Sequence, residues 1–291
     1  MFSTKWSYRI FDGTNILLLL GFSVLTFIPF LHVFAMSFLS LDNAKEFQRF
    51  LLWPTQWDFT SYQYIYDTRI FFSSLKNTVW ITVVGTLINI AFTSSMAYSC
   101  SRRSFSGKRW IMLMVLFTML FNGGLIPTYL VVNGLGLIDS LWAIVIPSAV
   151  SAFNMIVLKE FFEGIHESIL ESAKIDGCND LGIFFRIVLP LSLPALATFT
   201  LFYAVANWNQ YFASIIYTNS SDLWPLQVLL RQVVMVGQSD IFGAIDLSAP
   251  PPPPLSIQMA TVMYTSLPIL LLYPFLQKYF VKGMTLGAVK G

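Results

Sequence analysis

Charge is scarce in this sequence. Of its 291 residues only 11% are Asp, Glu, Lys or Arg, whereas 56% are hydrophobic. Soluble globular proteins carry roughly 25% charged residues. The net charge is only +2, and no Lys/Arg tract is dense enough to form a phosphate-binding surface. This composition excludes a nucleic-acid-binding role and predicts a protein that resides in a lipid bilayer.

Cysteine and histidine are rare too, with two of each. Cys100 and Cys178 are both expected at the cytoplasmic face, where thiols stay reduced, so no disulfide is expected. Glu163-Gly-Ile-His166 matches the Glu-x-x-His motif of di-iron helix bundles, but such a site needs a second pair. His32 has no carboxylate nearby in the sequence. The sequence therefore disfavours a membrane metalloenzyme, and we expect no metal, cofactor-binding or catalytic residue.

Long apolar stretches are abundant. A membrane-crossing helix needs about 20 residues with few or no charges. Six stretches without Asp, Glu, Lys or Arg meet this condition: roughly Asn15–Phe38, Asn77–Ser101, Trp110–Val132, Ser140–Leu158, Ile187–Tyr217 and Ile257–Gln277. The absence of these four residue types from the spans weakens the alternative of a secondary transporter or channel, because ion coupling often uses ionisable residues inside spans.

The distribution of basic residues predicts the orientation of the spans. With the N-terminus inside, 12 of the 17 Lys and Arg residues are cytoplasmic, as the positive-inside rule requires. The short loop Ser101–Arg109, with four basic residues, is the strongest single indication. Both termini are then cytoplasmic. The outer segments Leu39–Lys76 and Thr218–Ser256 are long enough to contact an external partner.

One cytoplasmic loop, Lys159–Arg186, is too long and too patterned for a simple turn. Its residues Glu167–Ile175 predict a short amphipathic helix. Gly177 is expected to end it, because glycine readily adopts the left-handed conformation that caps helices. The following apolar stretch leads to Pro190, which is tolerated near the start of a span.

Two interpretations of this loop remain open from its residues alone. A helical protrusion can fit a cleft of another protein, with Ala173 and Gly177 permitting close approach and Glu171 and Asp176 accepting charged hydrogen bonds. Alternatively, an amphipathic hairpin can rest on the lipid headgroups.

The spacing of the loop resembles a known motif. Glu171-Ser172-Ala173, three residues, Gly177, nine residues and Ile187-x-Leu189-Pro190 resemble the EAA loop of ABC importer permeases. The chain is similar to carbohydrate-importer permeases of the type-I fold, particularly the second permease of polysaccharide and oligouronide systems such as alginate importers. Ser172 replaces the first alanine of the motif, and His166 stands where relatives often carry proline.

The resemblance implies an all-α membrane protein with six transmembrane helices, the MetI-like fold, and a cytoplasmic coupling helix between spans four and five. Its implied organisation is an N-terminal span and outer segment (1–70), a permease core (71–282) and a cytoplasmic tail (283–291). The implied location is the bacterial plasma (inner) membrane. The implied ATPase-coupling residues are Glu171, Ser172, Ala173, Asp176, Gly177, Leu189 and Pro190.

The implied partners are a second permease that completes a heterodimer, two ATPase subunits, an external solute-binding protein and an oligosaccharide substrate. The chain contains no G-x-x-x-x-G-K-[ST] phosphate loop. ATP and Mg are therefore expected to be used by the partner subunits, with neither bound by this chain.

Candidate substrate contacts lie in the fifth span. Tyr203, Asn207 and Gln210 are spaced at i, i+4 and i+7, which predicts one polar helix face. Such a face lines a substrate path or makes interhelical hydrogen bonds. Asn122 is a weaker candidate of the same kind.

The outer segment Thr218–Ser256 supplies candidate contacts with the binding protein. These are Trp224, Gln227 and Arg231, because in the family this segment can reach toward the sugar site of the docked protein. Arg231 can pair with a carboxylate-bearing sugar or be an ordinary surface arginine.

Overall fold

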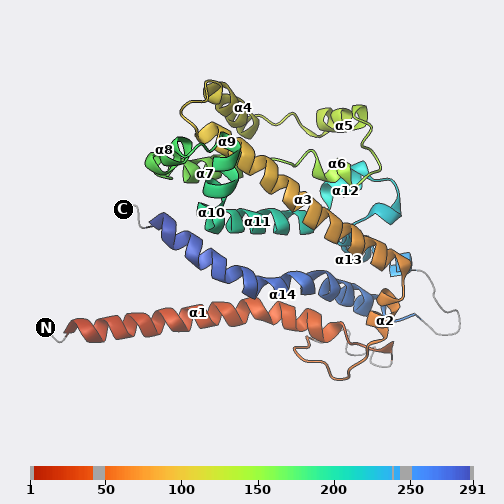
Figure 1. Ribbon diagram of the computed structural model, residues 1–291. Coiled ribbons are helices and arrows are strands. Elements are labelled where there is room, and N and C mark those ends of the chain that lie inside the picture. The colour runs from red at the N-terminus through yellow and green to blue at the C-terminus, as the bar shows by residue number, and fades with distance from the viewer. Residues whose placement is uncertain (1–2, 42–49, 238, 243–250, 289–291) are drawn as a thin grey trace. The chain divides into compact units, whose positions relative to one another are not determined.

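The computed structural model describes residues 3–41, 50–237, 239–242 and 251–288, all as helices and connecting segments without a strand in these ranges (Figure 1). The chain divides into two compact units. Unit 1 comprises residues 1–71 and 230–267, and unit 2 comprises residues 72–229 and 268–291. Parts of the expected outer segments, residues 42–49, 238 and 243–250, lie outside the described residues, as do residues 289–291 of the expected tail.

Unit 1 contains α1 (Ser3–Met36), α2 (Thr60–Tyr66), the 3-10 helix η4 (Ser239–Phe242) and the first part of α14 (Pro254–Ala288). An aromatic cluster follows the end of α1. Phe38 is buried there, and its ring lies 4.9 Å from the ring of Trp57 and 5.1 Å from that of Tyr62. Tyr62 also packs at 5.3 Å against Tyr264 of α14. These contacts join the segment between α1 and α2 to α14, the last long helix of the described residues.

Unit 2 is built around α3, whose residues run from Arg69 to Ser101. Its other elements are α4 (Lys108–Leu120), α5 (Leu125–Gly134), α6 (Trp142–Val145), α7 (Ala152–Glu163), α8 (Glu167–Ile175), α9 (Asp180–Ile183), the π-helix η2 (Phe184–Val188), α10 (Leu189–Leu191), α11 (Leu193–Trp208), α12 (Phe212–Tyr217), the 3-10 helix η3 (Ser221–Leu223), the start of α13 (Leu226–Val234) and the end of α14.

Fewer continuous spans are present than the six expected stretches suggest. In the described residues, three helical segments are long and apolar enough to cross a membrane: Tyr8–Met36, Arg69–Ser101 and Pro254–Leu271. A fourth forms if the bent pair Asp180–Leu191 and Leu193–Trp208 counts as one span. The stretches Trp110–Val132 and Ser140–Leu158, which we expected as single helices, are each divided between two shorter helices.

Local residue chemistry explains these divisions. The break between α4 and α5 contains Gly124, which has a positive φ of 86° that glycine adopts readily. The backbone amide of Gly124 donates a hydrogen bond to Asn122 Oδ1 at 2.9 Å. The break between α6 and α7 contains Pro147, which has no N–H to continue a helix. The average hydropathy of a stretch of about 20 residues is insensitive to a single glycine or proline, so the apolar stretches alone did not predict these two breaks.

Candidate functional site

The amphipathic helix that the sequence predicts at Glu167–Ile175 is α8, with the same bounds. Its end has the geometry of a Schellman motif. Gly177 has a φ of 84°, its amide donates to the Lys174 carbonyl at 3.0 Å, and the Cys178 amide donates to the Ala173 carbonyl at 2.9 Å. The predicted glycine stop is confirmed. His166 precedes the helix with a φ of −56°, a value within the range of proline, so the family's frequent proline suits this backbone.

The apolar face of α8 packs against its own chain. Leu170 and Ala173 are buried in a core that includes Tyr98 of α3 and Phe162 of α7. Ala173, expected to permit close approach of a partner, therefore lies inside unit 2. Ile169 and Ile175 of the same helix are 44% and 86% exposed, so only part of the apolar surface of α8 is covered by its own chain.

The opposite face of α8 is polar and exposed. Glu171, Ser172 and Asp176 all reach the surface. Among the described residues, the Glu171 side chain has no hydrogen-bond or ion-pair partner. This carboxylate is available to a group from outside the chain.

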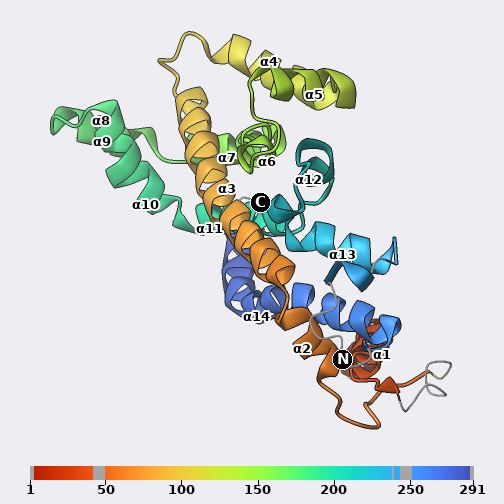
Figure 2. The ribbon, with the colours of Figure 1, turned by 90° about the vertical axis from the view of Figure 1, so that its right-hand side faces the viewer.

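The chain returns from α8 along an arm of short helices, α9, η2 and α10, which leads to α11 (Figure 2). The Asn179 side chain caps α9 by accepting a hydrogen bond from the Gly182 amide at 2.7 Å. The π-helix η2 ends at Val188, two residues before Pro190, which has no N–H to donate within the helix. The arm Asp180–Leu191 meets α11 at Ser192 with an angle of 83°. Leu189 and Pro190 thus lie just before this bend.

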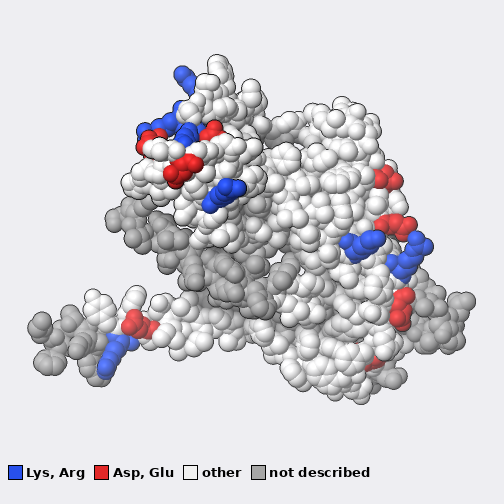
Figure 3. All heavy atoms as spheres, in the orientation of Figure 1, with Lys and Arg blue, Asp and Glu red and all other residues white. Residues whose placement is uncertain are grey.

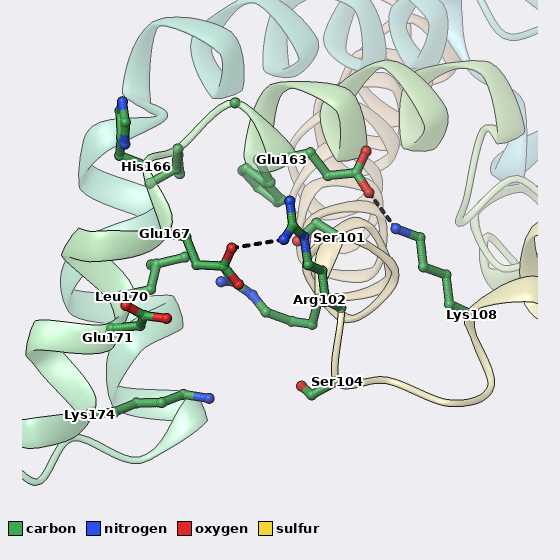
Figure 4. Close-up of a pocket in the computed structure, with 14 residues that line it drawn as sticks. Ser101, Arg102, Ser104, Lys108, Glu163, His166, Glu167, Leu170, Glu171 and Lys174 are labelled. Carbon is green, nitrogen blue, oxygen red and sulfur yellow. Dashed lines mark hydrogen bonds and ion pairs between the residues drawn. The ribbon is translucent and has the colours of Figure 1, made fainter.

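A cavity of about 900 Å³ lies beside α8, between the end of α3 and the end of α7 (Figure 4). Its walls carry ionic groups of both signs. Arg103 pairs with Glu167 at 3.2 Å, and Lys108 of α4 pairs with Glu163 of α7. Figure 3 shows basic and acidic side chains grouped together in the region where Figure 1 places α4 and α8.

In the sequence, the basic loop Ser101–Arg109 indicates only the orientation of the spans. The structure adds that Arg102, Arg103 and Lys108 of this loop line the same cavity as Glu171. The density of basic residues in so short a loop was the available signal, but its proximity to α8 required the tertiary fold.

The ion pairs fasten α7 to α4. Burial alone would raise the pKa of Glu163, but hydrogen bonds from Lys108 and Lys159 outweigh it and hold the pKa below its ordinary value. Burial alone would lower the pKa of Lys159, yet its hydrogen bonds to Glu160 and Glu163 raise it. Both groups are therefore stabilised in their charged forms at neutral pH.

The polar residues expected in the fifth span make interhelical hydrogen bonds. The Tyr203 hydroxyl bonds to the Thr93 hydroxyl at 2.7 Å and accepts from the Ser151 amide at 3.1 Å. Asn207 Nδ2 donates to Asn89 Oδ1 at 2.9 Å. Of the two interpretations, the structure therefore favours interhelical bonding for Tyr203 and Asn207.

Gln210 and Asn122 do not extend this polar face. α11 ends at Trp208, so Gln210 lies beyond the helix and does not share the predicted face. Asn122 is exposed in the break between α4 and α5. Neither side chain joins Tyr203 and Asn207.

The outer-segment candidates lie around the start of α13. Trp224 and Gln227 are half-buried, and Gln227 Nε2 donates to Asn209 Oδ1 at 3.3 Å. Arg231 is exposed in the part of α13 that belongs to unit 1. Within the described residues, no group of three or more His, Cys, Asp or Glu side chains is arranged to hold a metal ion.

Comparisons with known proteins identify the family. Residues 90–286 match the family described as "Binding-protein-dependent transport system inner membrane component". The polygalacturonan/rhamnogalacturonan transport system permease protein YtcP of Bacillus subtilis (strain 168) is 50% identical over 97% of this chain and 99% of its own length. The arabinooligosaccharides transport system permease protein AraQ of the same organism is 28% identical over 97% of this chain and 98% of its own length.

Solved structures agree with this assignment. A chain of a bacterial ABC transporter that imports the acidic polysaccharide alginate superposes with a TM-score of 0.86 and 34% identity, covering 94% of this chain and 98% of that one. A chain of an alginate transporter in complex with a periplasmic protein bound to alginate pentasaccharide matches with a TM-score of 0.59, 14% identity and coverage of 93% and 95%, and so supports the fold alone. This chain belongs to the binding-protein-dependent transport system inner membrane components, the permease subunits of ABC transporters.

Proposed function

We propose that this chain forms half of the translocation pathway of an ATP-driven importer for an oligosaccharide, with acidic, uronate-containing sugars as the favoured class. Support for the cargo comes from two similar proteins. One is named for polygalacturonan transport and shares half of its residues with this chain, and the other belongs to a transporter of an acidic polysaccharide.

The observation that carries the proposal is the surface of α8. A short helix, fixed by its buried residues and ended by a glycine turn, exposes the Glu171 carboxylate, which has no partner in the described part of the chain. In this role α8 is a coupling helix that enters a cleft of a cytoplasmic ATPase subunit, with Ser172, Asp176 and Gly177 at the contact. Ala173, Leu189 and Pro190 support the helix and its arm from inside.

The complete transporter complex in this proposal contains this chain, a second permease, two ATPase subunits that bind ATP and Mg, and an external solute-binding protein. The permease has six membrane crossings, with both termini in the cytoplasm and the divided helices of unit 2 completing the spans. ATP binding closes the ATPase dimer, α8 moves with it, and the pathway opens outward to receive the sugar.

Uptake of a labelled oligogalacturonide into vesicles that contain the full complex and its binding protein tests the function. We expect uptake that requires ATP and the binding protein. Uptake without ATP would support a secondary transporter or channel and contradict the proposal.

Two variants test the coupling role of α8. Glu171→Lys reverses the exposed charge, and Gly177→Asp places a side chain at a positive φ on the contact surface. Both should insert normally and lose ATP-driven uptake. Asp12→Lys, the same charge reversal at an exposed position of α1, is the matched control and should transport normally. Normal uptake by both α8 variants would refute the coupling role.

A further inference from the structure

α3 carries a line of buried polar side chains along one face. Thr78, Thr86, Asn89 and Thr93 are separated by three, four or eight residues, which places them on one side of a helix. Thr86 and Asn89 accept from Asn207 at 3.2 and 2.9 Å, and Asn89 Nδ2 donates to the Ser148 carbonyl at 2.6 Å. Thr86 and Asn89 therefore join α3 to α11, and Asn89 also joins α3 to the break between α6 and α7.

The outer end of this line binds the segment between α12 and α13. Asn77 Nδ2 donates to the Asp222 carbonyl at 2.7 Å and to the Trp224 carbonyl at 3.3 Å. Thr78 Oγ1 accepts from the Leu226 amide at 2.7 Å. Leu226 is the first residue of α13, where backbone amides have no partner within the helix. Thr78 supplies the missing acceptor from another helix.

The opposite end of α3 contacts the hairpin formed by α8, the turn at Gly177 and α9 (residues 167–183). The Tyr98 hydroxyl donates to the Asp180 carbonyl at 3.0 Å. Tyr98 also shares a core with Leu170 and Ala173 of α8. One unbroken helix thus binds the outer segment near its start and the coupling hairpin near its end.

The length of this connection matches a membrane. At a rise of 1.5 Å per residue, the stretch from Asn77 to Tyr98 spans about 32 Å, and the hydrocarbon core of a bilayer is about 30 Å thick. An unbroken α-helix transmits displacement along its axis because each turn is hydrogen-bonded to the next. Motion of the outer segment therefore reaches the hairpin without an intervening flexible loop.

We propose that Asn77 and Thr78 are positioning residues that clamp the segment Asp222–Leu226 to α3, so that docking of the solute-binding protein on the outer segment is transmitted to the ATPase through α3. This inference rests on the proposed function, because it requires both partners. The clamp acts on backbone groups, so it fixes the position of the segment whatever sugar is transported.

Thr78 offers an isosteric test with a matched control. Thr78→Val keeps the shape of the side chain and removes the acceptor of the Leu226 amide, whereas Thr78→Ser keeps the hydroxyl. Each variant is purified as the full complex in lipid nanodiscs. ATP hydrolysis is then measured alone and with the sugar-loaded binding protein. We expect Thr78→Val to reduce the stimulation by the binding protein by about fivefold or more, with unchanged basal hydrolysis, and Thr78→Ser to retain it.

The possible outcomes separate this inference from the proposed function. If the unaltered complex shows no stimulation, the proposed function fails. If it is stimulated and Thr78→Val is stimulated equally, the clamp is refuted. Asn77→Asp, which removes the amide donor at nearly constant size, is the second test if Thr78→Val does not assemble. Failure of both variants to assemble would show a purely structural role and overturn the proposal.

Discussion

The α8 surface and the interior between α3 and α11 use similar polar groups in opposite ways. Tyr203 and Asn207 lie inside unit 2, and their polar groups bond to residues of α3 and to the break before α7. Glu171 lies at the surface and has no partner among the described residues. A paired interior group specifies how helices pack, whereas an unpaired exposed group is free for another subunit. Variants of the first region should change stability, and variants of the second should change coupling.

The largest effect on stability is expected at Gly85. A Cβ atom added there would lie 2.9 Å from Asn207 Nδ2, so Gly85→Val overpacks the contact between α3 and α11. We expect a loss of about 1–3 kcal/mol, measured as a lower unfolding midpoint in detergent. Combining it with Asn207→Ala should destabilise the protein by less than the sum of the two single changes, because the alanine relieves the clash. Strict additivity would show that the two residues do not interact.

Tyr203→Phe should have a smaller effect. It keeps the ring but leaves the Thr93 hydroxyl and the Ser151 amide without this partner. Interhelical hydrogen bonds in membrane proteins contribute about 0.6–1.7 kcal/mol, so a lower unfolding midpoint with retained assembly is expected. If transport instead fails at unchanged stability, Tyr203 contacts the sugar, and the comparison between the two regions is wrong at this residue.

The ion pairs of Glu163 predict a pH effect of less than about 1 kcal/mol. Because the folded protein lowers the pKa of Glu163, its contribution is present above the ordinary carboxyl pKa and is lost as the pH falls through the folded value. Glu163→Gln should therefore lower the unfolding midpoint at pH 7 and leave it nearly unchanged at the acidic end. An equal shift at both pH values would contradict the ionic contribution.

Glu171→Gln should have the smallest effect on stability, within about 0.5 kcal/mol, because this exposed side chain has no described partner. Transport should nevertheless fall, since the partner cleft loses a charged acceptor. Unfolding midpoints and ATP-driven uptake are measured on the same preparations. A clear loss of stability would show that Glu171 belongs with the paired interior groups.

The sequence predicted local features better than distant contacts. The bounds of α8 and the turn at Gly177 followed from side-chain periodicity and from the conformational freedom of one glycine, both of which act within a few residues. The divided helices were missed because the apolar windows extend across Asn122, Gly124 and Pro147, which carry the breaks. Signals for those breaks were present but were outweighed by hydropathy.

The partners of buried groups could not be predicted in this way. The bond between Thr93 and Tyr203 joins residues that are 110 positions apart. Spacing indicated that Tyr203 and Asn207 share a helix face, but not which helix that face meets. The same limit applies to Ala173, whose small size suited an external contact as well as the interior position it occupies.

The bend at Ser192 limits how the hairpin can move. The arm from Asp180 to Leu191 is about 18 Å long at 1.5 Å per residue, so a rotation of about 10° at its base would move Asp180 by about 3 Å. Tyr98 holds the Asp180 carbonyl through a bond of 3.0 Å, which a displacement of that size would break. While the bond persists, a rotation of the arm about Ser192 also displaces Tyr98 and therefore α3.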